Sequence, residues 1–570
     1  MYRNDFVKFM RYNVRDCEIL KGLEDLKGYM MLAVMLSHTD AARVDDVIGT
    51  IKLTEASIIN YCHYTLNKRV PDTNRDIDPN AKKFKGAFVI PPTPGLHDWV
   101  ASIDVTSLYP SAMRAVNISP DTIVGQFTCY ADDFNKLRLR LEKEIHVQFE
   151  DGRVESQNAD EWVLWLLENG YAVSGFGTIF NQEKQGFIPA LLTLWFSQRK
   201  EYKAKAAVAK KEYQRLKAEG LPYKEAEDQY KYFDKVQTIY KLKLNSTYGA
   251  CGNKFFKFYD PRLAESTTQT GQQILFHMAR TIGKVIDGEY MFPNESVIYG
   301  DTDSCYFKTF AEDVEEALQI AELVAKRINK SFPKFCREFF CATEGYDDLV
   351  SVAQEIVASK SIFINGKKGY MMRVLKDEGK DVDKIKVTGL QIKKTTMPKP
   401  IRERMTEVFA DFLRGKEWDT AGLEILEYKE MLLKAELMKI GLPMRVKGID
   451  SYIERMNNNE EGLSVPGHVR SSILWNKCLE EYNDTATMRI VSGMKIQVYY
   501  LKKPIGKFKA IALPVDLDVI PDWFNDHWMR QIDRNVQVQK LVDMKLKSML
   551  LAINERIPTR KGLLIDELFS

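Results

Sequence analysis

Two carboxylates two positions apart stand out near the middle of the chain. Asp301 and Asp303 occur in the stretch YGDTDS, residues 299–304, between two runs rich in β-branched and aromatic residues. Such runs around a Gly-Asp pair predict a β-hairpin with both carboxylates at its tip. Because strand side chains alternate with period two, Asp301 and Asp303 can face the same side. A solvated turn explains the stretch equally well, since Asp and Gly are common turn residues.

A third carboxylate, Asp104, ends the apolar strand-like run VASID and precedes the segment VTSLYPS. It can join Asp301 and Asp303 in one acidic pocket if the two β elements lie side by side. Carboxylate oxygens suit Mg²⁺, a hard cation that is often bound together with phosphate groups. The alternative for Asp104 is a simple turn-forming role.

Two long helices can supply cations for such phosphates. A helical pattern runs from residue 189 to a Gly-Leu-Pro turn at 220–222, and a second one continues from there to residue 250. Helices joined by so short a turn must be antiparallel. The sequence therefore predicts a helical hairpin centred on Leu221.

The spacing in this hairpin brings cations to one height near its base. Positions equally far from Leu221 lie level, so Arg199 is level with Lys243. Arg199 and Lys203 share a helix face, as do Lys241 and Asn245, because each pair is four residues apart. Arg199, Lys203 and Lys241 can thus converge and attract phosphate oxygens. The alternative is a solvated, lysine-rich arm.

Carboxylates that hold a metal and cations that hold phosphates together indicate phosphoryl or nucleotidyl transfer. No GxxxxGK[ST] motif occurs, which argues against nucleotide binding by a P-loop.

The composition is that of a globular protein of several domains, with 570 residues, 45% hydrophobic and 28% charged. The net charge of +3 requires any basic surface to be local. The longest apolar run, GYMMLAVML at 28–36, is too short to span a membrane and predicts a buried helix. The eight cysteines contain no CxxC pair, which argues against structural zinc and fits a reducing cytoplasm.

Three motifs carry a family resemblance. DVTSLYPS, KLKLNSTYG and YGDTDS, in that order, resemble the polymerase motifs of family B DNA polymerases. The flanking segments RAVNISPDTIVG, FSQRKEYK and GACGNKFFKFYDPR are similar to those of the replicative polymerases of T-even-type bacteriophages. The resemblance runs from about Tyr12 to the C-terminus and is weakest between Tyr130 and Gly170 and in the last third.

The resemblance implies an α+β fold of right-hand polymerase architecture, with an antiparallel-sheet palm, two-helix fingers and a largely helical thumb. The implied parts are an exonuclease-domain remnant (1–22), a helical N-terminal-domain segment with a linker (23–80), the palm (81–188 and 253–400), the fingers (189–252) and the thumb with a C-terminal tail (401–570).

The resemblance also implies roles at the reaction centre. Asp104 and Asp303 would hold two Mg²⁺ ions, with Asp301 nearby as a less essential ligand. The remaining matched positions are the phosphate-binding amides of Ser107 and Leu108, the ring of Tyr109 that excludes a 2′-hydroxyl, the triphosphate-binding Arg199, Lys203 and Lys241 with Asn245 beside them, and Tyr248 and Gly249 under the nascent base pair.

Contacts to the primer-template are implied farther along the chain. Lys367, Lys368 and Tyr370 match the family's KKxY element, although Gly369 stands where relatives often carry a bulkier residue. Lys386, Thr388 and Gly389 resemble the stretch that leads into the thumb. In the thumb, His468 and Arg470 are candidates for contacts with the DNA backbone, and such contacts are independent of base sequence.

The two ends of the chain carry further expectations. Leu564, Leu568 and Phe569 lie in an apolar tail that resembles the sliding-clamp-binding tail of the phage enzymes. Tyr12 and Asp16 resemble the last of three exonuclease motifs, whereas the earlier motifs are missing. We therefore expect no proofreading by this chain alone, which would be a truncated product or a C-terminal subunit completed by a separate exonuclease chain.

The sequence thus predicts template-directed DNA synthesis from deoxyribonucleoside triphosphates on primer-template DNA. The enzyme would be a phage-like replicative polymerase, or its C-terminal subunit, in the cytoplasm of a host cell. A non-catalytic DNA-binding subunit is the first alternative, and the intact carboxylates and cations argue against it. An RNA-synthesising nucleotidyltransferase is the second, and Tyr109 argues against that.

Overall fold

The computed structural model describes residues 5–70, 85–128, 144–458, 462–517 and 519–560. The chain forms two compact units. The first comprises Met1–Val89, Ile103–Cys305 and Glu322–Ala353, and the second comprises Ile90–Ser102, Tyr306–Ala321 and Gln354–Ser570. No helix among the described residues is both long enough and apolar enough to cross a membrane.

Helices occupy the start of the chain. They are α1 (Phe6–Lys27), α2 (Tyr29–Asp40) and α3 (Thr50–Asn60), with short helical turns at Val44–Asp46 and Tyr61–Thr65. Gly28, with φ of +63°, separates α1 from α2. The linker expected before the first strand lies largely outside the described residues.

The prediction of a buried helix at 28–36 is wrong in part. The run does lie mostly in α2, but Tyr29, Met30 and Met31 are each more than half exposed. The helix packs from Leu32 onward, where Leu36 joins a small core with Leu53 of α3. An apolar run of nine residues covers every side of a helix, whereas α2 meets neighbours on one side only.

A seven-stranded sheet has the order β1-β8-β9-β2-β10-β11-β12. The predicted hairpin is confirmed, since β8 and β9 are hydrogen-bonded neighbours on either side of residues 302–303. The strands β10, β11 and β12 pair antiparallel. The bounds are β1 (Val89–Ile90), β2 (Gly95–Val105), β8 (Val297–Asp301), β9 (Ser304–Lys308), β10 (Val352–Phe363), β11 (Tyr370–Asp377) and β12 (Lys380–Thr388).

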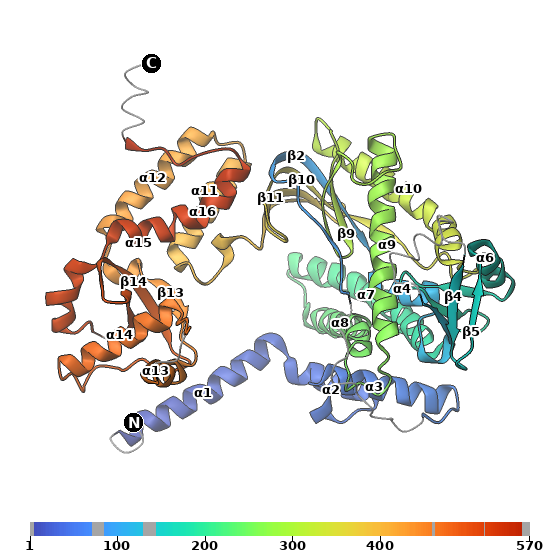
Figure 1. Ribbon diagram of the computed structural model, residues 1–570, viewed down its shortest axis with the longest axis horizontal. Helices are drawn as coiled ribbons and strands as arrows, with labels where there is room; N and C mark the ends of the chain where they lie inside the picture. Colours follow the sequence, from blue (N-terminus) through green and yellow to red (C-terminus); the bar gives the residue numbers. More distant parts are fainter. Residues whose placement is uncertain (1–4, 71–84, 129–143, 459–461, 518, 561–570) are drawn as a thin grey trace. The chain divides into compact units, whose positions relative to one another are not determined.

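Three helices, α4, α9 and α10, follow strands of this sheet in the chain. The segment after Asp104 is a turn followed by helix α4 (Leu108–Val116). Helix α9 (Pro261–Ile286) packs against α4 and α8, which Figure 1 labels, and against β8. Helix α10 covers Val314–Phe340. Gly271 of α9 is buried and lies beside Leu108 and Tyr109 of α4.

A second, antiparallel sheet has the order β5-β4-β3-β7-β6. Its strands are β3 (Ile123–Phe127), β4 (Ile145–Phe149), β5 (Val154–Gln157), β6 (Tyr171–Val173) and β7 (Thr178–Asn181), and a short helical turn, Pro120–Thr122, precedes β3. Helix α6 (Ala159–Glu168) buries Trp162 against the sheet, where the indole donates a hydrogen bond to the Ile145 carbonyl.

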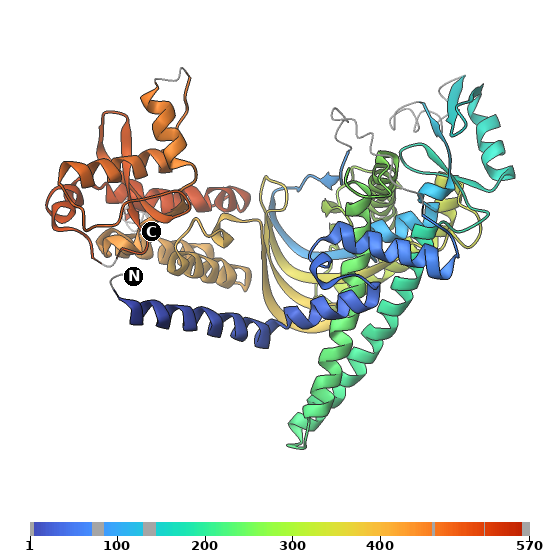
Figure 2. The ribbon, with the colours of Figure 1, turned by 90° about the horizontal axis from the view of Figure 1, so that it is seen from below.

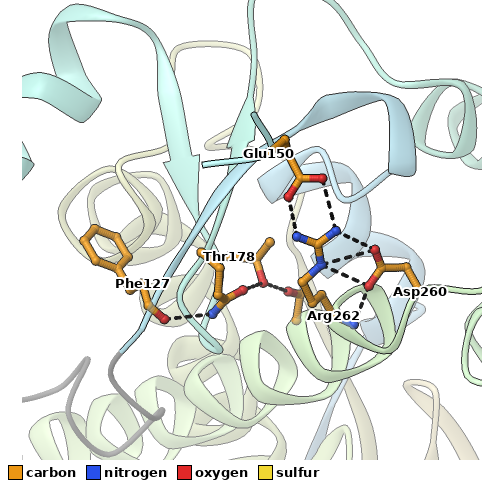
Figure 3. A network of polar contacts seen from close by, with 7 residues as sticks. Phe127, Glu150, Thr178, Asp260 and Arg262 are labelled. Carbon is orange, nitrogen blue, oxygen red and sulfur yellow. Dashed lines mark hydrogen bonds and ion pairs between the residues drawn. The ribbon is translucent and has the colours of Figure 1, made fainter. Parts of the chain in front are cut away.

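Figure 3 shows two polar links between this second sheet and α9. Arg262 bridges Glu150 and Asp260 through ion pairs. Nearby, Ser266 donates a hydrogen bond of 3.0 Å to the hydroxyl of Thr178. The second sheet is therefore held to the helix that also packs on α4.

The helical hairpin is confirmed as α7 (Phe187–Ala218) and α8 (Lys224–Cys251), which run side by side to a common tip in Figure 2. Tyr202 stacks near Tyr240 with ring centroids 6.1 Å apart, and Tyr213 near Tyr230 at 6.5 Å. Both pairs are centred on residues 221–222, as the predicted register requires. Gly186 is the N-cap of α7, and Phe187 begins the helix.

The last part of the second unit combines helices with a third sheet, so the largely helical segment expected there also holds strands. The order of the sheet is β13-β14-β15, and its core includes Trp475 and Tyr499. The helices are α11 (Lys399–Leu413), α12 (Trp418–Lys434), α13 (Ile449–Asn457), α14 (Gly467–Glu481), α15 (Arg534–Leu541) and α16 (Asp543–Ala552). The strands are β13 (Leu442–Arg445), β14 (Lys495–Ile505) and β15 (Phe508–Pro514), and short helical turns lie at Gln391–Lys393, Leu437–Lys439, Phe524–Trp528 and Met529–Gln531.

Candidate nucleotide and metal site

The strand end that carries Asp104 lies beside the hairpin tip that carries Asp303. The Val105 amide donates a hydrogen bond of 2.8 Å to the Asp303 carbonyl. Thr302 has a φ of +62°, and the Asp303 amide reaches back to the Asp301 carbonyl at 2.6 Å. The three aspartates are each partly exposed. The expectation that the two β elements lie side by side is therefore confirmed at the backbone.

The carboxylates at this place are oxygen donors of the kind that Mg²⁺ uses. Among the residues that the structure describes, no group of three or more His, Cys, Asp or Glu side chains is arranged to hold a metal ion. Mg²⁺ is commonly bound by one or two carboxylates and completes its coordination with water and phosphate oxygens. Asp104 on β2 and Asp303 in the adjoining β8–β9 turn, both partly exposed, fit a site of that composition.

The N-terminus of α4 lies directly after Asp104 in the chain. Ser107, with φ of +54°, precedes the first helical residue, Leu108. The first amides of a helix have no partner within the helix, and the helix dipole makes this end favourable for anions. The Nη1 atom of Arg199 donates a hydrogen bond of 3.3 Å to the Ser107 hydroxyl. A cation of α7 and the N-terminus of α4 are thus brought together, as a phosphate site requires.

The other candidate cations lie on exposed parts of the helical hairpin. Arg199 is partly buried, and burial lowers the pKa of its guanidinium from the usual value. Lys203, Lys241 and Asn245 are exposed. Lys243, which the register places level with Arg199, is buried and forms an ion pair with Asp40 instead.

Tyr109 stands where α4, α8 and the carboxylates meet. Its ring centroid is 4.4 Å from that of Tyr248, with the planes tilted by 37°. Burial raises the pKa of the Tyr109 hydroxyl, and Tyr248, Asp303 and Asp301 raise it further. The phenol is therefore neutral and lies within the electrostatic field of both hairpin carboxylates. Gly249 follows Tyr248 at an open position, since a Cβ there would have no neighbour within 4 Å.

Two features of this region were missed by sequence reasoning. The partnership of Lys243 with Asp40 joins segments 203 residues apart, and no local pattern signals it. Gly271 in α9 packs against α4, and a glycine in the middle of a helical pattern is the signal that could have pointed to it.

The residues of the KKxY-like element belong to the second unit and differ in exposure. Lys367 and Lys368 are exposed between β10 and β11. Tyr370 is only 6% exposed, and its hydroxyl lies 3.3 Å from that of Tyr306. A Cβ on Gly369 would come within 2.5 Å of Ile364. Ile364 therefore fills the space beside Gly369, the position where relatives often carry a bulkier residue.

The stretch after this element is held by its own contacts. Lys386 forms a 3.6 Å ion pair with Glu355, and Thr388 pairs with Tyr370 across β11 and β12. Gly389 has a φ of +64° and approaches the Lys368 carbonyl too closely for any side chain. The backbone that carries Lys368 is therefore fixed from the neighbouring strand.

The remaining predicted contacts are placed as follows. His468 and Arg470 lie in the first turns of α14, both partly exposed. Arg470 donates hydrogen bonds to the carbonyls of Val465 at 3.0 Å and Lys507 at 3.2 Å. Tyr12 and Asp16 are exposed on α1, and Leu564, Leu568 and Phe569 lie outside the described residues. The contacts predicted for these residues stay predictions.

Comparison with known proteins identifies the family. The sequence profile of DNA polymerase family B matches residues 52–458. The chain is 24% identical to the DNA-directed DNA polymerases of Escherichia phage RB69 and Enterobacteria phage T4, in each case over 94% of this chain and 62% of the relative. It is 26% identical to the DNA polymerase delta catalytic subunit of Dictyostelium discoideum over 53% of this chain and 24% of that protein. The chain spans about three-fifths of the length of the phage relatives and belongs to DNA polymerase family B.

Proposed function

We propose that this protein synthesises DNA on a template by adding deoxyribonucleotides to a primer 3′-hydroxyl. The observation that carries the proposal is the hydrogen bond between Val105 and Asp303. It brings two carboxylate-bearing β elements together beside the N-terminus of α4 and Arg199. Family membership and the names of the relatives support the same reaction.

In the proposed reaction, the 3′-oxygen of the primer forms a bond to the α-phosphorus of the incoming nucleotide. The bond from that phosphorus to the bridging oxygen breaks, pyrophosphate leaves, and the hydroxyl proton is lost to solvent. Asp104 and Asp303 would hold the divalent ions, two Mg²⁺ in our proposal, with Asp301 as their helper. When bound, such ions supply activation of the hydroxyl and neutralisation of developing phosphate charge.

The chain's own cations would hold the triphosphate. Arg199, which already contacts Ser107, stands closest to the N-terminus of α4, and the amides of Ser107 and Leu108 would bind phosphate oxygens. Lys203 and Lys241 are exposed and can reach further phosphate oxygens, with Asn245 beside them.

The aromatic pair would select and support the nucleotide. The ring of Tyr109 would lie against C2′ of the sugar and exclude a 2′-hydroxyl by steric contact. Tyr248 and Gly249 would form the surface under the new base pair, where glycine permits close approach. The packing of the two tilted rings, with centroids 4.4 Å apart, supports a shared platform.

The finer architecture follows the same proposal. The helical hairpin would act as fingers, the strands that carry the aspartates as palm, and residues 401–570 as thumb. Primer-template DNA would be contacted by Lys367, Lys368 and Tyr370 and by His468 and Arg470. The ring of Tyr370 is buried, so this residue would act through the backbone that it supports. Clamp docking by the tail, a separate exonuclease chain and a cytoplasmic location stay predictions.

Primer extension with Mg²⁺ and the four deoxyribonucleotides tests the proposal. The unaltered protein should extend the primer, whereas Asp303→Asn should lose at least about a thousandfold in rate through its lost charge. Affinity for primer-template DNA should be retained. Asp228→Asn, at the exposed tip of the hairpin, is the matched control and should extend normally. Template binding without extension by the unaltered protein would instead identify a DNA-binding subunit.

A further inference from the structure

Gly271 lies in the interior of α9 at a place where a side chain would strike Tyr109. A Cβ built on Gly271 would stand 3.2 Å from Cδ2 of Leu108 and 3.3 Å from Cε1 of Tyr109. Both distances are shorter than ordinary van der Waals contact, so the neighbours would have to move by a few tenths of an ångström.

The backbone of Gly271 does not itself require glycine. Its φ is not in the left-handed region, where glycine is favoured. In a helix interior, glycine is the least favourable residue apart from proline. The close approach of α4 to α9 is therefore the structural reason for glycine at this position.

The two neighbours differ in their freedom to yield. Leu108 is only 3% exposed and belongs to the core beneath α4. The ring of Tyr109 is partly exposed and has Tyr248 on α8 as its other aromatic neighbour. Burial raises the pKa of its hydroxyl, and the charges of Asp303 and Asp301 add to that shift. The Tyr109 ring is thus set between two helices, and the absent side chain of Gly271 leaves it room toward α9.

We propose that Gly271 is a positioning residue for sugar selection: it lets the Tyr109 ring sit back against α9. This inference rests on the proposed role of Tyr109 and extends it to a second helix. A methyl group at Gly271 moves the ring away from α9 and into the space proposed for the sugar. Gly271 touches no substrate and acts only through the ring.

Gly271→Ala is the direct test, because alanine favours the helix and the new contact needs only a small shift. The measured quantities are kcat and KM for a deoxyribonucleotide and for the matching ribonucleotide in primer extension. We expect KM for the deoxyribonucleotide to rise by roughly threefold to tenfold, with a smaller change in kcat, because small misplacements at a reacting centre are costly. Ribonucleotide insertion should fall below that of the unaltered protein.

Combination with Tyr109 variants shows whether the effect passes through the ring. In a Tyr109→Phe background the ring remains, so Gly271→Ala should raise KM by a similar factor. In a Tyr109→Ala background the ring is gone, so Gly271→Ala should change KM by less than a factor of about two. Gly22→Ala, where a Cβ has no neighbour within 4 Å, is the helical control and should leave both nucleotides unaffected.

The outcomes separate this inference from the proposal beneath it. If Tyr109→Ala leaves ribonucleotide insertion unchanged, the role of Tyr109 fails and the inference fails with it. If Tyr109→Ala raises ribonucleotide insertion while Gly271→Ala alters neither nucleotide, only the role of Gly271 is overturned. An equal effect of Gly271→Ala with and without the Tyr109 ring also overturns it, since the substitution then acts by another route.

Discussion

Lys243 of α8 forms a buried ion pair with Asp40 of α2, and their side chains are only 4% and 1% exposed. The ammonium group also lies 4.3 Å from the centroid of the Trp195 ring on α7. Ser57 of α3 donates a hydrogen bond of 2.5 Å to the same carboxylate. This cluster holds the base of the helical hairpin to the helices at the start of the chain. Lys243 lies on α8, the helix that also carries Lys241 and Asn245.

Loss of one partner of this pair should be costly. Lys243→Met leaves the Asp40 carboxylate buried without its counter-charge, and we expect the free energy of unfolding to fall by about 3–5 kcal/mol. Burial lowers the pKa of Lys243, while Asp40 opposes that shift. Urea unfolding followed by circular dichroism measures the change.

Two further variants define this result. The double variant Lys243→Met with Asp40→Leu removes both charges and should recover most of the lost stability. Lys205→Met breaks an exposed pair with Glu201 on α7 and should change stability by less than about 1 kcal/mol. If Lys243→Met lowers the free energy of unfolding by no more than Lys205→Met does, the buried pair is not important for stability.

The sequence predicted features that depend on neighbouring residues. The β8–β9 hairpin follows from alternation around one turn, and the register of α7 and α8 follows from their short connection. Whether a side chain is buried depends on what packs against it from elsewhere. For that reason the helical spacing did not reveal the burial of Lys243, and the apolar start of α2 was expected in a core.

The residues of the candidate site also fall into those that local sequence indicates and those that depend on distant contacts. Types and order of residues were enough to nominate Asp104, Asp303 and Arg199, because motif chemistry is local. The contact between Gly271 and Tyr109 joins two helices that are distant in sequence, and spacing carries no information about it. Tyr370 was nominated for DNA contact by its motif, yet its neighbours in the sheet bury the ring.

Removal of a cation that is proposed to bind the triphosphate should raise KM for the nucleotide. Lys241→Met deletes an exposed ammonium group on α8. The charge-assisted hydrogen bond that would be lost contributes about 1.5–3 kcal/mol, so KM for deoxyribonucleotides should rise by roughly tenfold to a hundredfold. Steady-state primer extension measures it. Lys231→Met, on the same helix but paired with Glu227, should keep the original KM. Equal effects of the two variants would indicate a general effect of charge on the hairpin.

Primer-template binding should depend on Lys367 and Lys368 through phosphate charge. Replacing both with alanine should weaken binding to every DNA sequence alike, because interactions with the DNA backbone carry no base information. The slope of log affinity against log salt should become shallower by about 0.9 for each phosphate that the protein no longer neutralises. Titration of labelled DNA at several salt concentrations measures both. Lys380→Ala, exposed at the start of β12, is the control, and a slope unchanged by the double substitution would exclude the proposed phosphate binding.

Acid should destabilise the first unit through His277. The imidazole is 4% exposed, stacks on Phe335 at 4.1 Å, and has Tyr290 and Ser331 hydroxyls within 2.8 Å of its nitrogens. Burial, aided by the charge of Arg280, lowers the pKa of His277 to about 4. The unfolded chain takes up this proton near pH 6.5, whereas the folded protein resists it, so stability is full above about 6.5 and is lost as the pH falls toward 4.

This difference in pKa predicts a decrease of about 3 kcal/mol in unfolding free energy between pH 6.5 and 4. His277→Gln retains groups that can hydrogen-bond to both hydroxyls but does not titrate, so its stability should vary less with pH over that interval. His63→Gln, at an exposed position, should keep the slope of the unaltered protein. Urea unfolding at half-unit steps of pH distinguishes them, and identical slopes for His277→Gln and the unaltered protein would show that the buried imidazole is not the group responsible.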